Sequence, residues 1–137
     1  GEHAPGSGER FFRSQILGEV CSPLGCPFGK QHFARSTFNH VDFGARAASL
    51  AVSATKSMHG HLLGGAGAIE AIATVLALRE QVIPPTANLN PGTLDPICGG
   101  VDHVFAGRHD VPLRAALSNS FAFGGSNAVL AFRAVSQ

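Results

Sequence analysis

Residues 52–70, VSATKSMHGHLLGGAGAIE, carry most of the information about how this chain folds. The stretch leaves a short apolar segment, passes a polar turn containing Lys56 and Gly60, and enters a long apolar run that ends before Pro84. Such a run favours a helix. Because it is apolar nearly all round, it is typical of a helix buried inside a larger protein. We therefore predict a buried helix over residues 61–81.

The flanking segments predict an α/β arrangement. Residues 50–55 and 101–105 suit short strands, and residues 114–120 and 128–135 form a strand pair around a glycine-containing turn. Residues 88–100 are rich in Asn, Pro and Gly, and we expect an extended loop there. The buried helix needs apolar cover on every side, and a fragment of this length cannot supply that cover.

The first part of the chain has a different character. Residues 1–46 mix Gly, Pro, Cys, Phe and Arg without sustained periodicity. We expect a loop there, or a segment that does not fold well by itself. We leave residues 1–46 unassigned and place the regular elements in residues 47–137.

Charge and cysteine content exclude several classes of partner. The chain carries 10 Lys and Arg against 9 Asp and Glu, so its formal charge of +1 disfavours binding to nucleic acid or an anionic membrane. The longest apolar run, residues 66–78, is interrupted by Glu70 and is too short to span a bilayer. Cys21, Cys26 and Cys98 have no paired metal-type spacing, and we find no secretory leader. We expect a cytoplasmic protein in a reducing compartment.

Lys56 and His61 place a cation and an imidazole at the start of the predicted helix. The positive end of the helix dipole disfavours imidazolium, so we expect a neutral His61 that donates one hydrogen bond to an oxyanion or enolate. Glu70 lies in the apolar run, where a lone carboxylate is costly, so we expect a cationic partner, with Lys56 as the candidate. Alternatively, His61 only caps the helix, Lys56 is solvated and Glu70 reaches a wet edge.

Two other interpretations of this region lack support. His59 and His61 form a His-x-His pair, but no third or fourth zinc ligand stands at a sensible spacing. The glycines Gly64, Gly65 and Gly67 lack the pattern of a phosphate-binding loop, so we attribute them to close helix packing.

A second motif, SNSFAFGGSN, covers residues 118–127. The aromatic side chains of Phe121 and Phe123 stand beside Gly124 and Gly125, so the turn has accessible backbone amides next to rings that can gate a cavity. Taken alone, this turn fits a glycine hairpin with core phenylalanines better than a functional site.

Together the two motifs resemble the β-ketoacyl synthases, namely the type II fatty acid elongation enzymes and the polyketide ketosynthase domains. The first motif is similar to the family's Lys-x-x-x-Gly-His segment. The second is similar to its Asn-Ser-Phe-Gly-Phe-Gly-Gly-Thr-Asn turn, with Ala122 replacing a glycine and Ser126 a threonine. The resemblance covers residues 48–135. It implies an α/β fold that is part of the C-terminal half of a thiolase-like α/β/α/β/α sandwich, normally a homodimer.

The resemblance also implies an activity, that of a 3-oxoacyl-[acyl-carrier-protein] synthase. In this family a cysteine takes an acyl chain, and malonyl-ACP loses carbon dioxide to give a carbanion that attacks the thioester in fatty acid biosynthesis. No resident cofactor is implied, because the 4'-phosphopantetheine arrives on acyl carrier protein. By the motif match, His61 corresponds to a catalytic histidine, Lys56 to the lysine that orders the site, and Glu70 to the buried acid associated with it.

The second motif carries the implied gate. Phe123 resembles the family's gating phenylalanine, whose backbone amide contributes to the oxyanion hole, and Phe121 and Gly124 stand beside it. Ala122 departs from the family pattern by one methyl group.

Two of the three catalytic side chains of the family are missing from this sequence. His32 and His40 lack the following residues of the His-Gly-Thr-x-Thr motif, and no cysteine stands in the small-residue context of the nucleophile. Residues 1–46 do not resemble the family, and we hypothesise that they arise from a shifted frame, a rearranged gene or a non-homologous fusion, with a divergent genuine segment as the alternative. The chain is then either a fragment of a fatty acid or polyketide synthase, or a non-catalytic partner similar to the chain-length factors, completed by a complementary ketosynthase chain.

Overall fold

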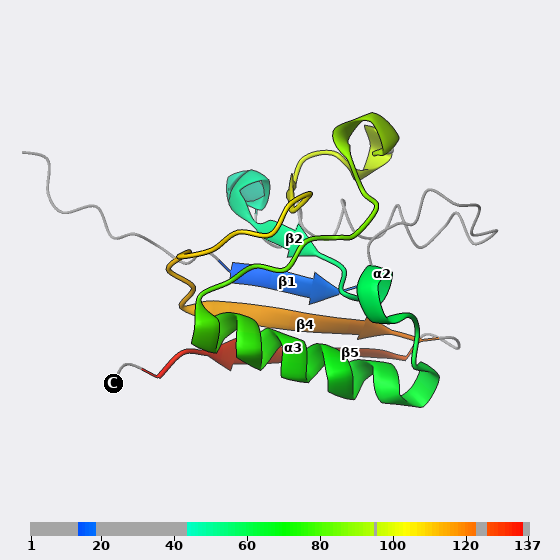
Figure 1. The fold of residues 1–137 in the computed structure, drawn as a ribbon, viewed down its shortest axis with the longest axis vertical. Coiled ribbons are helices and arrows are strands. Elements are labelled where there is room, and N and C mark those ends of the chain that lie inside the picture. The colour runs from blue at the N-terminus through cyan, green and yellow to red at the C-terminus, as the bar shows by residue number, and fades with distance from the viewer. Residues whose placement is uncertain (1–13, 19–43, 95, 123–125, 136–137) are drawn as a thin grey trace, which may run out of the picture.

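A five-stranded sheet forms the centre of the protein. The structure is a computed structural model that describes residues 14–18, 44–94, 96–122 and 126–135. Its strands occur in the order β3-β2-β1-β4-β5 (Figure 1). In sequence order they are β1 (Ser14–Gly18), β2 (Ala51–Ser53), β3 (Asp102–His103), β4 (Ala115–Phe121) and β5 (Asn127–Arg133).

Strand β1 is the central strand of this sheet. Ile16 pairs in parallel with Val52 of β2 on one side and with Leu117 of β4 on the other. The loop predicted for this part of the chain is therefore wrong at Ser14–Gly18. Five residues are too few to show a period, and their pairing depends on strands far along the chain. The remaining residues before Gly44 lie outside the described ranges.

The other predicted strands are confirmed with small changes in their bounds. Strand β2 pairs with β3 in parallel, and β4 pairs with β5 antiparallel, with Leu117 opposite Ala131. The strand pair around the glycine-containing turn is therefore present. Instead of an extended loop, the stretch from residue 88 contains two short 3-10 helices, η3 (Pro91–Thr93) and η4 (Pro96–Cys98).

The predicted long helix is confirmed for α3 (Ala66–Glu80) and is wrong for residues 61–65. A 3-10 turn, η2 (Leu63–Gly65), precedes α3, and Leu63 has a φ of 50° that no α-helix accommodates. Upstream, the polar turn contains the short helix α2 (Lys56–His59), and η1 (Gly44–Ser49) leads into β2.

Helix α3 covers one face of the sheet. Its Leu78 joins a buried cluster with Ala51 of β2 and Ala116 of β4. The opposite face carries a smaller cluster formed by Leu50 and Val52. Figure 1 shows α3 running alongside β4 and β5.

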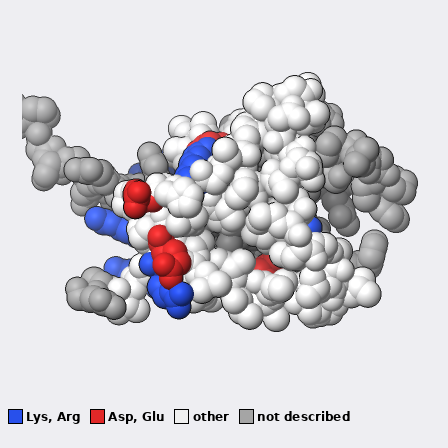
Figure 2. Space-filling model, in the orientation of Figure 1, with Lys and Arg blue, Asp and Glu red and all other residues white. Residues whose placement is uncertain are grey.

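The outer surface of α3 is apolar and exposed, as its composition predicts. Ile72 is 59% exposed, Val75 46% and Leu76 42%. In Figure 2 the charged side chains over this helix gather at its carboxyl-terminal end, where Arg79 and Glu80 lie. We call Ile72, Val75 and Leu76 the outer α3 stripe.

Candidate functional site

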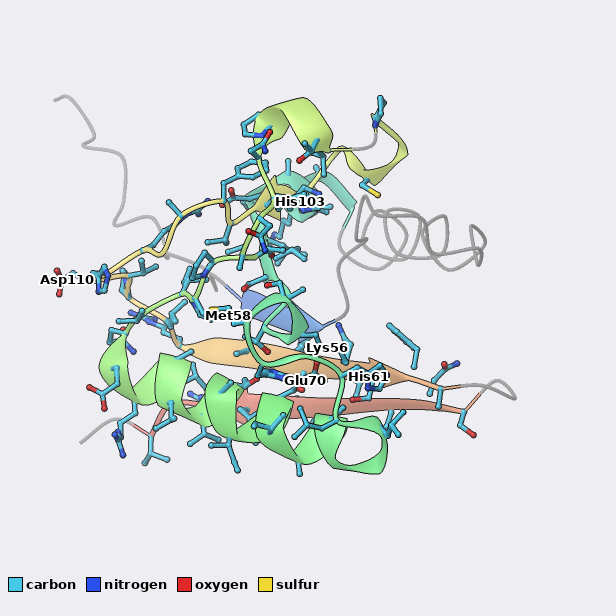
Figure 3. The ribbon with its side chains drawn as sticks, turned by 45° about the vertical axis from the view of Figure 1, so that its right-hand side comes forward. Lys56, Met58, His61, Glu70, His103 and Asp110 are labelled. Carbon is cyan, nitrogen blue, oxygen red and sulfur yellow. The ribbon has the colours of Figure 1, made fainter. Side chains whose placement is uncertain are left out.

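The candidate site residues gather where the parallel strands end. Strand β2 ends at Ser53 and runs into α2, which begins with Lys56. Figure 3 shows Lys56 and Glu70 together, with His61 in the same part of the view; the three residues come from α2, the following loop and α3. The carboxyl ends of parallel strands are the usual position of binding sites in α/β proteins.

Lys56 and Glu70 form a buried ion pair. Lys56 Nζ contacts Glu70 Oε1, and the two side chains are 15% and 2% exposed. The expected cationic partner of Glu70 is therefore present, and neither a solvated Lys56 nor a Glu70 at a wet edge agrees with this burial. Glu70 Oε2 is also buried and has no hydrogen-bond partner in the described part of the chain. The carboxylate thus depends on Lys56 for its stabilisation.

The backbone that presents Lys56 is held by the loop after α3. Ala54 N donates to Thr86 Oγ1 over 2.9 Å, and Ala87 N donates to Ser57 Oγ over 2.8 Å. Ser57 Oγ in turn donates to Ala54 O over 2.7 Å. Sequence reasoning missed Thr86 and Ser57, because their pairing joins positions about thirty residues apart and leaves no local pattern.

His61 lies in an exposed loop, and its ring orientation is set by the backbone. Leu63 N donates to His61 Nδ1 over 3.0 Å. A nitrogen that accepts a hydrogen bond carries no proton, so the neutral ring has its hydrogen on Nε2. The predicted helix-dipole effect on His61 is a wrong explanation, because α3 begins five residues later, at Ala66, and the dipole effect falls off within the first turn.

The described residues of the second motif lie at the end of β4 and at the start of β5. Phe121 is half-buried and pairs with Asn127, and Ala122 N donates to Ser126 O over 2.8 Å. Phe123 and Gly124 lie outside the described residues, so their gating roles stay predictions.

Close helix packing explains only one of the three glycines of the first motif. A Cβ on Gly67 would stand 3.4 Å from Ser120 Oγ, whereas a Cβ on Gly64 would have nothing within 4 Å. At Gly65 the nearest atom would be Leu62 Cβ at 3.7 Å, an ordinary contact. The packing prediction is therefore wrong for Gly64. Gly67 allows the first turn of α3 to lie against β4, next to the second motif.

Within the described ranges, no group of three or more His, Cys, Asp and Glu side chains is placed to hold a metal ion. Cys98 is a buried cysteine in η4, away from the first motif in sequence. In the same part of the chain, no helix is long and apolar enough to cross a membrane.

The comparisons with known proteins agree on one family. A family model described as the C-terminal domain of beta-ketoacyl synthase matches residues 26–90. 3-Oxoacyl-[acyl-carrier-protein] synthase 2 of Synechocystis sp. (strain ATCC 27184 / PCC 6803 / Kazusa) is 54% identical over 91 residues, which are 66% of this chain and 21% of that protein. The chain belongs to the β-ketoacyl synthase family, and it matches the C-terminal part of that family. It spans about a fifth of that relative's length.

Solved ketosynthase structures share the fold. A type II polyketide ketosynthase in complex with its acyl carrier protein superposes with a TM-score of 0.76 at 30% identity, covering 90% of this chain and 28% of that chain. The ishigamide ketosynthase/chain length factor gives a TM-score of 0.71 at 30% identity, with the same coverage. The α/β, thiolase-like fold of the ketosynthase segment is thus confirmed. The family match begins at residue 26, ahead of the boundary that we placed after residue 46.

Proposed function

We propose that this segment contributes the malonyl-decarboxylating side of a 3-oxoacyl-[acyl-carrier-protein] synthase active site. When the carbon–carboxylate bond of a malonyl thioester breaks, its electron pair passes to the α-carbon and is shared with the thioester oxygen. His61 Nε2–H donates a hydrogen bond to that oxygen and stabilises the enolate. The α-carbon then attacks an acyl thioester, and the released thiolate takes up a proton.

The observation that carries this proposal is the hydrogen bond from Leu63 N to His61 Nδ1. It supports a neutral ring with its donor at Nε2, which is the form that an enolate oxygen requires. The Lys56–Glu70 ion pair supports the same role by holding α2 against the first turns of α3. Phe121, Phe123 and Gly124 are proposed to contribute the gate and the oxyanion-hole amide, by resemblance to the family.

The proposed reaction also needs catalytic side chains that this chain does not supply. The nucleophilic cysteine and the first histidine would come from a longer form of this protein or from a complementary chain, in a homodimer or a mixed dimer. We propose acyl carrier protein as the partner, since one similar structure is a ketosynthase in complex with its carrier protein. The phosphopantetheine would arrive on that carrier, without a resident cofactor. We also propose a reducing, cytoplasmic location, by resemblance to the family.

A chimera tests the proposal. Residues 47–135 of this chain replace the matching segment of the Synechocystis synthase, and carbon dioxide release from malonyl-ACP and formation of the 3-oxoacyl product are both measured. We expect activity in the chimera and a loss of about 100-fold or more in kcat for His61→Ala. His109→Ala, at an exposed position of the loop before β4, is the matched control and should change neither rate.

A folded chimera without activity, or an unchanged rate in His61→Ala, would refute the proposed role of His61. Folding is checked independently by the circular dichroism spectrum and by the elution volume of the dimer.

A non-catalytic partner role is the second candidate. It is favoured by the similarity to the ishigamide ketosynthase/chain length factor and by the missing nucleophile motif. Intact-mass measurement after incubation with an acyl thioester separates the two candidates for this chain. Acylation of a cysteine that hydroxylamine reverses supports an enzyme, whereas an unmodified chain that binds a ketosynthase supports a partner.

A further inference from the structure

The side chain of His59 spans the turn between Lys56 and His61. His59 Nδ1 lies 2.7 Å from Gly60 O, and His59 Nε2 lies 3.2 Å from Thr55 Oγ1. A carbonyl oxygen only accepts, so Nδ1 carries the hydrogen and donates to it. In the neutral ring Nε2 then accepts the hydrogen of the Thr55 hydroxyl. Both ring nitrogens are thus engaged, in the tautomer opposite to that of His61.

These two hydrogen bonds act on the peptide that leads into His61. Gly60 O belongs to the peptide group whose nitrogen is that of His61, and Gly60 N donates to Lys56 O over 2.8 Å. Thr55 is buried and lies two residues after Ser53, the last residue of β2, so His59 ties this peptide to a buried point close to the end of that strand. His59 thus holds the carbonyl of the Gly60–His61 peptide, while the hydrogen bond of Gly60 N holds the peptide before it.

The hydrogen bond from His59 holds the carbonyl of Gly60, a residue whose backbone angles are less restricted than those of other residues. Gly60 has φ of 78° and ψ of −179°, a region that only glycine occupies readily. A Cβ at Gly60 would have nothing within 4 Å, so the glycine is required by the backbone angles and not by lack of space. A flexible residue directly before His61 leaves the ring direction undefined unless a neighbouring group fixes the peptide.

We infer that His59 is a positioning residue, which holds the Gly60–His61 peptide so that the His61 ring meets Leu63 N and keeps its proton on Nε2. The assignment excludes His59 as a zinc ligand paired with His61, because both ring nitrogens of His59 already make hydrogen bonds to the protein. Only the catalytic consequence of this positioning rests on the proposed function.

The test uses the full chain labelled with 15N in histidine and in the backbone. Ring 15N spectra give the tautomer of His61, and hydrogen exchange gives the protection of the Leu63 amide; sedimented protein is measured under magic-angle spinning if the chain associates. His59→Ala removes both side-chain bonds. His59→Asn places an amide N–H near the position of Nδ1 and keeps a donor for Gly60 O. His109→Ala is the matched control.

We expect His59→Ala to speed exchange of the Leu63 amide by about tenfold or more and to move the His61 ring shifts towards those of mixed tautomers. We expect the Leu63 exchange rate and the His61 ring shifts of His59→Asn to stay close to those of the parent chain. We expect His109→Ala to change neither quantity. An unchanged Leu63 amide in His59→Ala would overturn the inference. So would an equal loss of protection at Ala116 in the core of β4, since that result indicates global destabilisation.

The two proposals fail separately. The synthase chimera could be inactive while His59→Ala still speeds exchange of the Leu63 amide and shifts the His61 tautomer. The positioning role is then supported and the proposed function is refuted. If the chimera is active and the ring 15N spectrum of His61 is the same in the parent chain and in His59→Ala, the positioning role is refuted instead.

Discussion

Removing the charge of Glu70 is the perturbation whose size the structure defines best. Glu70→Gln keeps the shape of the side chain but leaves the Lys56 cation without its counter-charge. Breaking a buried ion pair from one side costs about 3–5 kcal/mol. Because the Lys56 side chain is 15% exposed and retains some water, we expect the lower end, about 3 kcal/mol.

The reverse substitution should cost more. Lys56→Met removes the cation from the Glu70 carboxylate, which is 2% exposed and whose Oε2 already lacks a hydrogen-bond partner in the described residues. We therefore expect this change to lower the free energy of unfolding by about 5 kcal/mol. Replacing both residues, as Lys56→Met with Glu70→Gln, removes the charges together. We expect the double variant to be more stable than the sum of the single changes by about 2 kcal/mol or more.

Urea unfolding followed by circular dichroism measures these free energies. Arg79→Ala is the matched control, because it breaks an exposed ion pair with Glu80 on the same helix and should cost no more than about 0.5 kcal/mol. The reasoning is refuted if Glu70→Gln costs less than about 1 kcal/mol and the double variant is additive, since the pair would then behave as a solvent-exposed one.

The remaining predictions concern the support of the site and the outer α3 stripe. Thr86→Val leaves the buried Ala54 N without its acceptor and should lower the urea unfolding free energy by about 1–3 kcal/mol, whereas Thr86→Ser should retain most of it. Gly60→Ala should cost about 1–3 kcal/mol from backbone strain, and an unchanged melting temperature would contradict the φ of 78°. Val75→Glu with Ile72→Lys should reduce self-association in sedimentation velocity; a parent chain that is already a sharply melting monomer would contradict the exposed stripe.

The ion pair could be predicted from the sequence because its cause is local. A carboxylate in an apolar helix needs a cation, and Lys56 lies in the polar turn just before the predicted helix. The outer α3 stripe was predictable for a similar reason. A helix that is apolar all round has more apolar surface than one face of a sheet can bury, so part of it must stay exposed. Both arguments need only composition and approximate periodicity.

Features that depend on distant pairing or on single backbone angles escaped prediction. Strand β1 is recognised only when β2 and β4 lie on either side of it. The start of the helix was misplaced because Leu63 takes a positive φ, and this error carried over to the dipole argument for His61. The supporting role of Thr86 likewise follows from a contact across 32 positions in the chain.

Fragment complementation tests the central claim most directly, namely that this segment holds one side of a ketosynthase site and depends on other parts for the rest. Formation of 3-oxoacyl product from acyl-ACP and malonyl-ACP is measured for the full chain alone, for the amino-terminal portion of the Synechocystis synthase alone, and for the two combined. We expect product only from the combination, and its loss in His61→Ala. Product from the chain alone would contradict the claim, because a nucleophile would then have to reside in this sequence.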